Sequence, residues 1–502
     1  MRHLALLLAL VLVAPAAAAT IHGSLRGELI LGTAGPDRIR AGAGEDFVQA
    51  AFGGTDSVDC GAGIDLVTAD LVDRVTHCET VVRRLSVDPY ANTDSQHETA
   101  VEPDSFAFGS TVVAAFQLGR RAAGASANIG TAVSRDAGRT WQRGLLPGVT
   151  AQSVPPGLEA SASDPSVAYD AVHAVWLVGT LTLETPNNSH VFVSRSTDGL
   201  HWQAPVDVAS GPLLDKDWLV CDNGAASPFR GRCYAEYTDD QQNQTVSQFT
   251  TDGGVTWSAP VRSTSTLVGT QPVVRADGAL VVVAGDYNGA AALSGSIVAV
   301  RSTDGGATFT RTTVASLRAH DNNPLRAIPL PSVDIDSAGT IYASWHDCRF
   351  RTACAANDIV LSTSTDGGLT WTAPARVPVA LTSSSVDAFI PGLAADPAQP
   401  GHLALVYASY STAACHDGAC TLGIGFITSL DGGATWSAPR RLHAQPFLTS
   451  WLALAEGGRM VGDYFSTSFV GDRVVPVFTL AVPPVNGRLR EAIFAASLPA
   501  GT

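Results

Sequence analysis

The chain has 502 residues, of which 15% are charged, and it contains 48 Gly and 28 Pro. This composition is typical of many short strands joined by turns, so it predicts an all-β protein without long helices. The net charge of −15, with no basic stretch, argues against nucleic acids and anionic membrane surfaces as partners, because both need clustered cations.

Residues 1–19 have the features of a secretory signal peptide. A positive start is followed by an apolar run too short to span a bilayer and by small residues suited to cleavage near Ala19. We therefore expect a secreted, extracellular protein, and no later apolar segment reaches membrane-spanning length. The cysteines agree with an oxidising compartment, because they fall in the sequence as four close pairs. The pairs are Cys60 with Cys78, Cys221 with Cys233, Cys348 with Cys354, and Cys415 with Cys420.

Residues 20–85 form a separate Gly- and Asp-rich module. Asp37, Asp46, Asp56 and Asp65 recur at intervals of nine, ten and nine residues, and an apolar residue follows each of them two positions later. The pattern resembles the calcium-binding nonapeptide repeat of the RTX family, although most turns read Ala-Gly or Gly-x in place of Gly-Gly. The resemblance implies a short parallel β-roll in which these four carboxylates bind Ca²⁺. The alternative is a metal-free roll joined by a disulfide between Cys60 and Cys78.

A second motif, Ser/Thr-x-Asp-x-Gly-x-Thr-Trp, recurs through the rest of the chain. Its Asp can accept hydrogen bonds from its own turn, Gly supplies a positive φ, and the aromatic residue can pack between neighbouring sheets. The copies return about every 50 to 65 residues, which predicts a β-propeller of small four-stranded sheets. They span Ser134 to Trp141, Ser196 to Trp202 (one residue short), Thr250 to Trp257, Ser302 to Phe309, Ser364 to Trp371 and Ser429 to Trp436.

This motif resembles the Asp-box, or bacterial neuraminidase repeat, of the sialidase superfamily, and residues 86–500 are identified as a sialidase-like propeller. Seven blades are favoured, with six as the alternative. Seven candidate first strands carry a polar residue at or near their start, and the last is followed by only two further strands. A strand from residues 83–88 would complete that last blade. The candidate first strands begin near His97, Asp164, Asp215, Gln271, Arg326, Ala388 and Gly462.

Ionic residues are expected to gather at one rim of this propeller. The starts of first strands share a face with the ends of second strands, opposite the Asp-boxes, and a ring of carboxylates with a few cations would form a polar ligand site there. Lys216 is the only lysine of the chain. The expected rim residues are Glu98, Asp164, Asp215, Lys216, Gln271, Arg326, Asp387, Asp463 and Tyr464, with Arg120, Asp286, Asp347 and Arg349.

The resemblance implies an exo-α-sialidase type of glycoside hydrolase acting on extracellular glycans or glycoproteins. It assigns the substrate carboxylate to Arg120, Arg326 and Arg349, the nucleophile to Tyr464 activated by Glu98, and the acid/base to Asp164. The family's Phe/Tyr-Arg-Ile-Pro signature is missing from the first blade, and the nearest string is Leu325 to Pro329. The alternative is a non-catalytic propeller that binds glycan or protein, with the first module as a calcium-dependent spacer and the rim ions bridging blades.

Overall fold

The computed structural model describes residues 18–185, 188–263, 266–288, 292–413, 415 and 420–501. The predicted signal peptide therefore lies almost wholly outside the described residues. The chain divides into two compact units, one up to Val81 and one from Val82 onward. In the described part the only helices are the short 3-10 turns η1 (Thr352–Cys354) and η2 (Thr449–Trp451), so the all-β expectation is confirmed. None of the described helices is long and apolar enough to cross a membrane.

The first unit contains two parallel sheets, ordered β1-β3-β5-β7 and β2-β4-β6. Their strands are β1 (Thr20–His22), β2 (Leu29–Leu31), β3 (Arg38–Ala43), β4 (Phe47–Gln49), β5 (Ser57–Ala62), β6 (Leu66–Asp70) and β7 (Arg74–Thr76). Arg38 pairs with Ser57, so one turn of the chain adds one strand to each sheet. Close stacking requires glycine at the turns, since a Cβ on Gly63 would lie 1.7 Å from the Gly44 carbonyl oxygen.

Apolar side chains fill the space between these two sheets. Ile39, Val48, Val58 and Val67, the residues that follow the repeated aspartates, are at most 1% exposed and belong to one core cluster. Their burial is what alternation along a parallel strand produces when one face is covered.

The second unit is built from antiparallel sheets in which consecutive strands pair. The first two sheets are β9 (Ala100–Phe108), β10 (Thr111–Arg120), β11 (Ser126–Ser134), β12 (Gln142–Leu145) and β13 (Ser161–Asp170), β14 (Val175–Thr185), β15 (Asn188–Ser196), β16 (Val206–Gly211). Two more are β17 (Leu214–Cys221), β18 (Cys233–Asp239), β19 (Gln244–Thr250), β20 (Val261–Arg262) and β21 (Val268–Val274), β22 (Leu280–Tyr287), β23 (Ser294–Ser302), β24 (Thr310–Arg318).

The later sheets repeat this order up to the C-terminal region. They are β25 (Ser332–Ile335), β26 (Ile341–Asp347), β27 (Asp358–Ser364), β28 (Ala375–Arg376) and β29 (Asp387–Ala395), β30 (Leu403–Tyr410), β31 (Thr421–Ser429), β32 (Arg440–Arg441), with β33 (Phe447–Leu448) added to β31. A hairpin of β34 (Ala453–Ala455) and β35 (Gly458–Met460) follows. The last strands are β36 (Ser466–Val470), β37 (Arg473–Ala481), β38 (Glu491–Ala496) and β39 (Leu498–Pro499).

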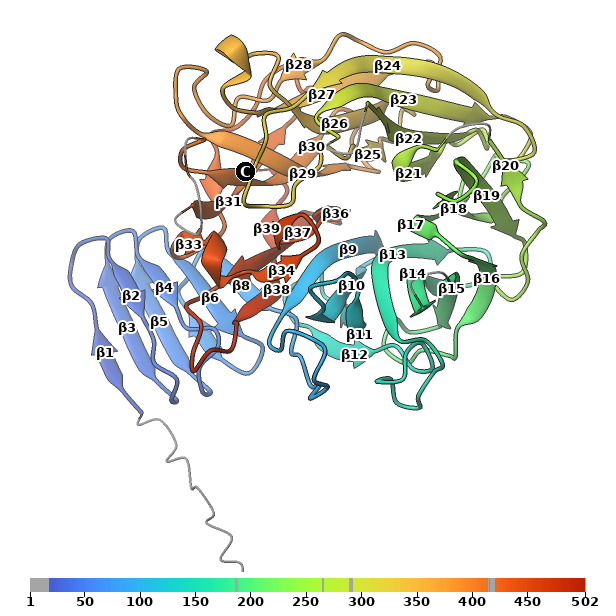
Figure 1. Ribbon diagram of the computed structural model, residues 1–502. Coiled ribbons are helices and arrows are strands. Elements are labelled where there is room, and N and C mark those ends of the chain that lie inside the picture. Colours follow the sequence, from blue (N-terminus) through green and yellow to red (C-terminus); the bar gives the residue numbers. More distant parts are fainter. Residues whose placement is uncertain are drawn as a thin grey trace, which may run out of the picture. The chain divides into compact units, whose positions relative to one another are not determined.

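The final sheet takes a strand from the other end of the sequence. Residues 82–84 of β8 (Thr80–Arg84) pair with β38, so that Arg84 lies opposite Phe494. Within this unit, Figure 1 shows the sheets following one another around a common centre, with β9, β13, β17, β21, β25, β29 and β36 innermost. Each of these strands contacts the next, and β36 contacts β9 again.

All six Asp-box signatures lie between the third and fourth strands of their sheets, as the sequence predicts. In the copy at Asp304, the carboxylate accepts hydrogen bonds from the Thr308 N–H at 2.9 Å and from the Ser302 hydroxyl at 2.7 Å. Trp202 packs into the core formed with the preceding sheet, beside Val113. The boxes therefore shape turns and join neighbouring sheets, which is a structural role.

The four predicted disulfides are confirmed. The bonds are Cys60–Cys78, Cys221–Cys233, Cys348–Cys354 and Cys415–Cys420, and no described cysteine is free.

Candidate functional site

Bulges in the innermost strands set the geometry of the centre of the second unit. In β9 two residues, Glu102 and Pro103, lie opposite a single residue of β10. The same bulge occurs in β13, where it begins at Asp164, and in β17, where it begins at Lys216. The φ angles of Glu102, Asp164 and Lys216 are 53°, 45° and 53°. A positive φ at a residue other than glycine costs about 1–3 kcal/mol, so surrounding contacts must hold these side chains in place.

The Lys216 ammonium group is the centre of this cluster. Its Nζ donates to Asp164 Oδ1 at 3.1 Å and to Asp463 Oδ2, and the lysine side chain is 7% exposed. Burial by itself would lower the pKa of Lys216, but the charges of Asp164 and Asp463 outweigh it and raise that pKa well above its usual value. Lys216 is therefore a permanent cation that binds two carboxylates.

Two predicted arginines lie in the same cluster. Arg326 Nη2 donates to Asp463 Oδ2 at 2.8 Å, and Arg120 Nη1 donates to Gln117 Oε1 at 2.8 Å. Burial favours the neutral form of Asp463, but Arg326 and Lys216 outweigh burial and lower the pKa of that carboxyl. Asp463 is therefore ionised near neutral pH.

Other carboxyl groups around Lys216 are shifted in the opposite direction. Burial and the neighbouring Asp164 charge raise the pKa of Glu102 to about 7 and that of Asp215 to about 7. The pKa of Asp217 is raised well above its usual value for the same reasons. Glu102 is 1% exposed and Asp215 is partly exposed, so Asp215 is the more accessible of the two, while Asp217 lines the central cavity and the other two do not.

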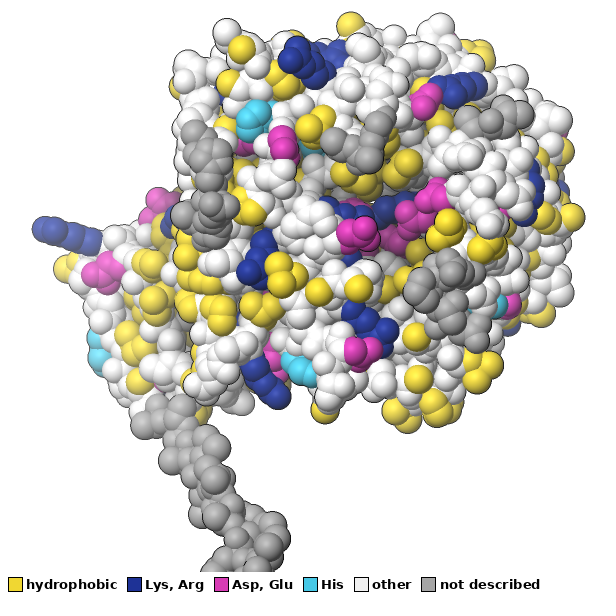
Figure 2. All heavy atoms as spheres, in the orientation of Figure 1, with side chains coloured by type: hydrophobic (Ala, Val, Ile, Leu, Met, Phe, Trp, Pro, Cys, Tyr) yellow, Lys and Arg dark blue, Asp and Glu magenta, His cyan; other side chains and the backbone are white. Residues whose placement is uncertain are grey.

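A cavity opens onto this cluster. Asp164, Lys216, Asp217, Gln271 and Asp463 line it, together with the aromatic side chains of Trp218 and Tyr464. The two rings make an edge contact with centroids 5.0 Å apart. In the space-filling view, acidic and basic side chains gather in a hollow at the centre of the second unit (Figure 2). A polar floor beside aromatic walls is the usual composition of a small-molecule site.

The predicted nucleophile Tyr464 lies in this cavity, but its expected activator lies elsewhere. The Tyr464 hydroxyl donates to the Pro165 carbonyl oxygen at 3.1 Å. After burial, the charge of Glu102 has the largest effect on Tyr464 and raises its pKa well above the usual value. Glu98 precedes β9, where its N–H donates to Asp88 Oδ2. The structure thus brings Glu102, not Glu98, beside the tyrosine.

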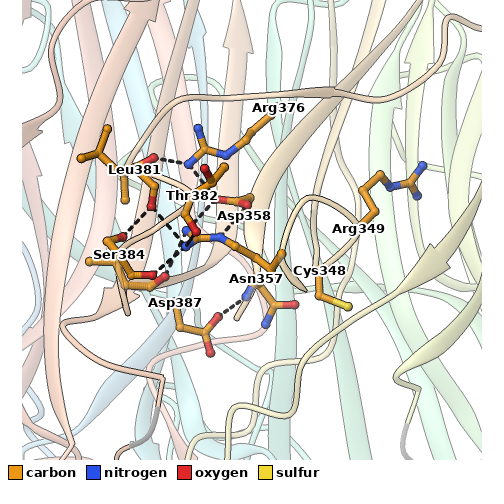
Figure 3. A network of polar contacts seen from close by, with 12 residues as sticks. Cys348, Arg349, Asn357, Asp358, Arg376, Leu381, Thr382, Ser384 and Asp387 are labelled. Atoms are coloured by element: carbon orange, nitrogen blue, oxygen red, sulfur yellow. Dashed lines mark hydrogen bonds and ion pairs between the residues drawn. The ribbon is translucent and has the colours of Figure 1, made fainter. Parts of the chain in front are cut away.

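Arg349 is not brought into the cluster by any of its described contacts. Its guanidinium pairs with Asp347, with an Nη2 to Oδ2 distance of 2.7 Å, and it also donates to the Ser316 carbonyl oxygen. Figure 3 shows Arg349 to one side of Asn357, Asp358 and Asp387, with its guanidinium directed away from them. Asp387 accepts hydrogen bonds from Asn357 and His320. Three predicted rim residues, Asp347, Arg349 and Asp387, therefore serve other contacts.

Most of the remaining predicted rim residues lie near Lys216, and one makes its contacts elsewhere. Asp164, Asp215, Gln271, Arg120 and Arg326 join the cluster around Lys216, whereas Asp286 forms a half-exposed pair with Arg311. Glu102, Asp217 and Trp218 also lie in or beside the cavity and are not among the predicted rim residues. A usable signal for Glu102 is the proline that follows it, because proline inside a central strand marks a bulge, and Asp164 is likewise followed by Pro165.

The repeated aspartates of the first unit stack their carboxylates along the roll. Asp56 Oδ1 accepts the Asp37 N–H at 2.7 Å, and Asp65 Oδ1 accepts the Asp46 N–H at 2.8 Å. The Oδ2 atoms of Asp46, Asp56 and Asp65 are buried without a hydrogen-bond partner. In the described residues no group of three or more acidic, histidine or cysteine side chains could hold a metal ion, so these side chains would need backbone carbonyls to complete a calcium site.

Comparison with solved structures finds distant matches. A crystal structure of a protein of unknown function from Dyadobacter fermentans is 15% identical, with 83% of this chain and 99% of that chain covered and a TM-score of 0.43. The Hadza microbial sialidase Hz136 is 15% identical over 80% of this chain and 66% of its own, with a TM-score of 0.41. The intramolecular trans-sialidase from Ruminococcus gnavus is 15% identical over 79% and 93%, with a TM-score of 0.37.

These likenesses carry no argument about activity, because the TM-scores are below 0.5. No curated protein matches the chain significantly. The family described as a BNR repeat-like domain matches residues 190–412, which contain four of the Asp-box signatures. The comparisons therefore identify a BNR repeat-like region in this chain.

Proposed function

We propose that the second unit is a seven-bladed, sialidase-like β-propeller whose central cavity is a glycoside hydrolase site. The blade count is supported by the seven innermost strands that contact one another in sequence and by the pairing of β36 to β38 with β8. A six-bladed ring would leave one of these sheets outside the circle of contacts.

The observation that carries the enzymatic proposal is the separation of carboxyl pKa values around Lys216. Asp215 is partly exposed with a pKa of about 7, so it holds a proton near neutral pH, while Asp463 is ionised. Hydrolysis of a glycosidic bond needs one carboxylic acid to protonate the leaving oxygen and one carboxylate to stabilise or attack the sugar cation. In this proposal Asp215, the neighbour of the lining residue Lys216 in β17, is the proton donor, and Asp463 is the ionised partner.

An exo-α-sialidase on extracellular glycans is the more specific form of the proposal. It is supported by Arg120, Arg326, Asp164 and Tyr464 sharing one cluster, with Glu102 in the place expected for Glu98. It would also require a movement that brings Arg349 from Asp347 to the substrate.

Turnover of a panel of 4-methylumbelliferyl glycosides by the purified protein tests the proposal. The panel includes the α-N-acetylneuraminide and neutral furanosides and pyranosides. We expect hydrolysis of at least one substrate, and a loss of about 10²-fold or more in kcat/KM for Asp215→Asn, because general acid catalysis contributes about that much. Asp286→Asn is the matched control, since Asp286 forms only a half-exposed pair with Arg311. No hydrolysis of any substrate would exclude the enzymatic proposal.

A non-catalytic glycan- or protein-binding propeller is the second candidate. It is favoured by the Tyr464 hydroxyl, which is bonded to a backbone carbonyl and not to a base. Glycan binding without turnover would support this candidate over the first.

For the first unit we propose calcium binding, supported by the unpartnered Oδ2 atoms of Asp46, Asp56 and Asp65. Calcium should raise the melting temperature of this unit and a chelator should reverse the effect, with Mg²⁺ as the control. An unchanged melting curve would contradict it. We also propose that the protein is secreted, which the four disulfides support.

A further inference from the structure

The cations of the central cavity are already paired with protein groups. Lys216 contacts both Asp164 and Asp463, Arg326 contacts Asp463, and Arg120 donates to Gln117. Glu102, Asp215 and Asp217 also surround Lys216, but their pKa values are raised, so near neutral pH these carboxyl groups hold protons at least part of the time. Of the three cations, Lys216 lines the cavity, and it already contacts two carboxylates. A sugar acid would therefore place its negative charge beside Asp164 and Asp463 at a lysine that they already occupy, and like charges placed together are costly.

The buried lining atoms that lack a partner are mostly acceptors. Both carboxyl oxygens of Asp217 and the Oδ1 atom of Asp463 have no hydrogen-bond partner, and these residues are 1% and 2% exposed. Asp463 is ionised and can only accept, whereas the raised pKa of Asp217 lets its carboxyl group hold a proton and both donate and accept. The Nε atom of Arg120 is an unpartnered donor, but Arg120 does not line the cavity. A buried acceptor is satisfied by a ligand that donates, as a hydroxyl group does and a carboxylate does not.

The walls of the cavity suit the apolar face of a sugar ring. Trp218 is partly exposed and lies edge-on to Tyr464, so its ring can pack against C–H groups. The Gln271 Oε1 atom accepts the Val333 N–H, and its Nε2 group can donate to a hydroxyl oxygen. Aromatic side chains beside carboxylates give a surface that is apolar on one side and hydrogen-bonding on the other.

Resting on the proposed function, we infer that the ligand of this cavity is an uncharged sugar that presents hydroxyl donors to Asp217 and Asp463, and not a sugar acid. Of the arginines that would bind a sugar acid, Arg326 instead holds the Asp463 carboxylate, and Arg120 donates to the neutral Gln117 side chain. The substrate class therefore differs from the one that the family resemblance implies.

A glycan array with matched neutral and sialylated structures tests the inference with the wild-type protein, alongside turnover of the fluorogenic panel. We expect binding or turnover of neutral structures, with sialylated termini at least about ten-fold weaker. Equal or preferred recognition of sialylated structures would overturn the inference and leave the hydrolase proposal standing. Binding of neutral glycans without any turnover would support the inference and exclude the hydrolase. No binding and no turnover would overturn both.

A variant tests whether the negative charge of Asp463 is what disfavours sugar acids. Asp463→Asn keeps the shape of the side chain and removes the negative charge that neutralises Lys216 and Arg326. We expect this variant to gain about ten-fold in affinity for sialylated structures, whereas Asp286→Asn should show no change. An unaltered preference in a folded Asp463→Asn protein would contradict the electrostatic argument. If the variant fails to fold, the wild-type array still decides.

Discussion

Replacing Lys216 with methionine should destabilise the second unit by an amount that depends on pH. The substitution leaves Asp463 paired with Arg326 at 2.8 Å, but it removes the cation that lies 3.1 Å from Asp164. At an effective dielectric constant of about 20, that contact corresponds to about 5 kcal/mol of Coulomb energy. Removing one partner of a buried pair typically costs about 3–5 kcal/mol.

Proton uptake limits this loss. A buried carboxylate without a cation can become neutral, which for an ordinary aspartate costs about 4 kcal/mol at pH 7 and about 1.5 kcal/mol at pH 5. We therefore expect Lys216→Met to lower the free energy of unfolding by about 4 kcal/mol at pH 7 and by about 1.5 kcal/mol at pH 5. Urea titrations followed by tryptophan fluorescence at the two pH values measure both quantities.

The double variant Lys216→Met with Asp164→Asn is the control. It removes the unpaired carboxylate, so it should recover most of the loss and its stability difference from wild type should vary little between pH 5 and pH 7. A loss below about 1 kcal/mol at pH 7, or an equal loss at both pH values, would refute the reasoning.

Three further outcomes are expected. If Asp215 is the proton donor, its pKa of about 7 means that kcat/KM falls as pH rises above about 7, whereas a flat profile from pH 6 to pH 9 would exclude that role. Burial raises the pKa of Glu236 to about 8, so the free energy of unfolding of the wild type should fall between about pH 4.5 and pH 8, because the unfolded state releases this proton at lower pH than the folded state. In urea titrations Glu236→Gln should therefore become more stable than the wild type at pH 9. A stability difference between the two proteins that does not change with pH would contradict the assignment. Asp304→Ala removes the acceptor of an Asp-box turn and should lower the free energy of unfolding in urea by about 1–2 kcal/mol. Thr303→Ala, at the exposed neighbouring position, should change this free energy little. Equal losses in the two variants would show that the turn does not depend on the Asp304 carboxylate.

Local signals in the sequence predicted the turns, the paired cysteines and the strand order, because each depends on residues close together in the chain. The motif around Asp304 determines its own turn, and the stretch that supplies the final strand was identified near residue 83. Lys216 and Asp463 are different, since their contact joins positions 247 residues apart and sequence alone could place both only on a common rim.

The exact membership of the cluster could not be read from alternation of polar and apolar residues. The bulge at Glu102 adds one residue to β9 and directs this side chain to Gln117 and the Lys216 cluster, whereas Glu98 lies before the strand and contacts Asp88. Arg349 follows β26, as expected for the rim, but its guanidinium is bound by the nearby Asp347 carboxylate. Such competition between partners is decided by tertiary packing.

The pairing of β8 with β38 has a consequence for how the molecule assembles. In the sequence, residues 82–84 of β8 begin the second unit, whereas β38 lies more than 400 residues later. The Ser86 hydroxyl, just after β8, also accepts the Ile493 N–H of β38 at 2.8 Å. The last sheet therefore cannot be completed until β38 has left the ribosome, more than 400 residues after β8. Contacts of such high sequence separation form late and slowly. An incomplete chain would expose an unpaired edge strand, so truncation at the C-terminus should favour aggregation over partial function.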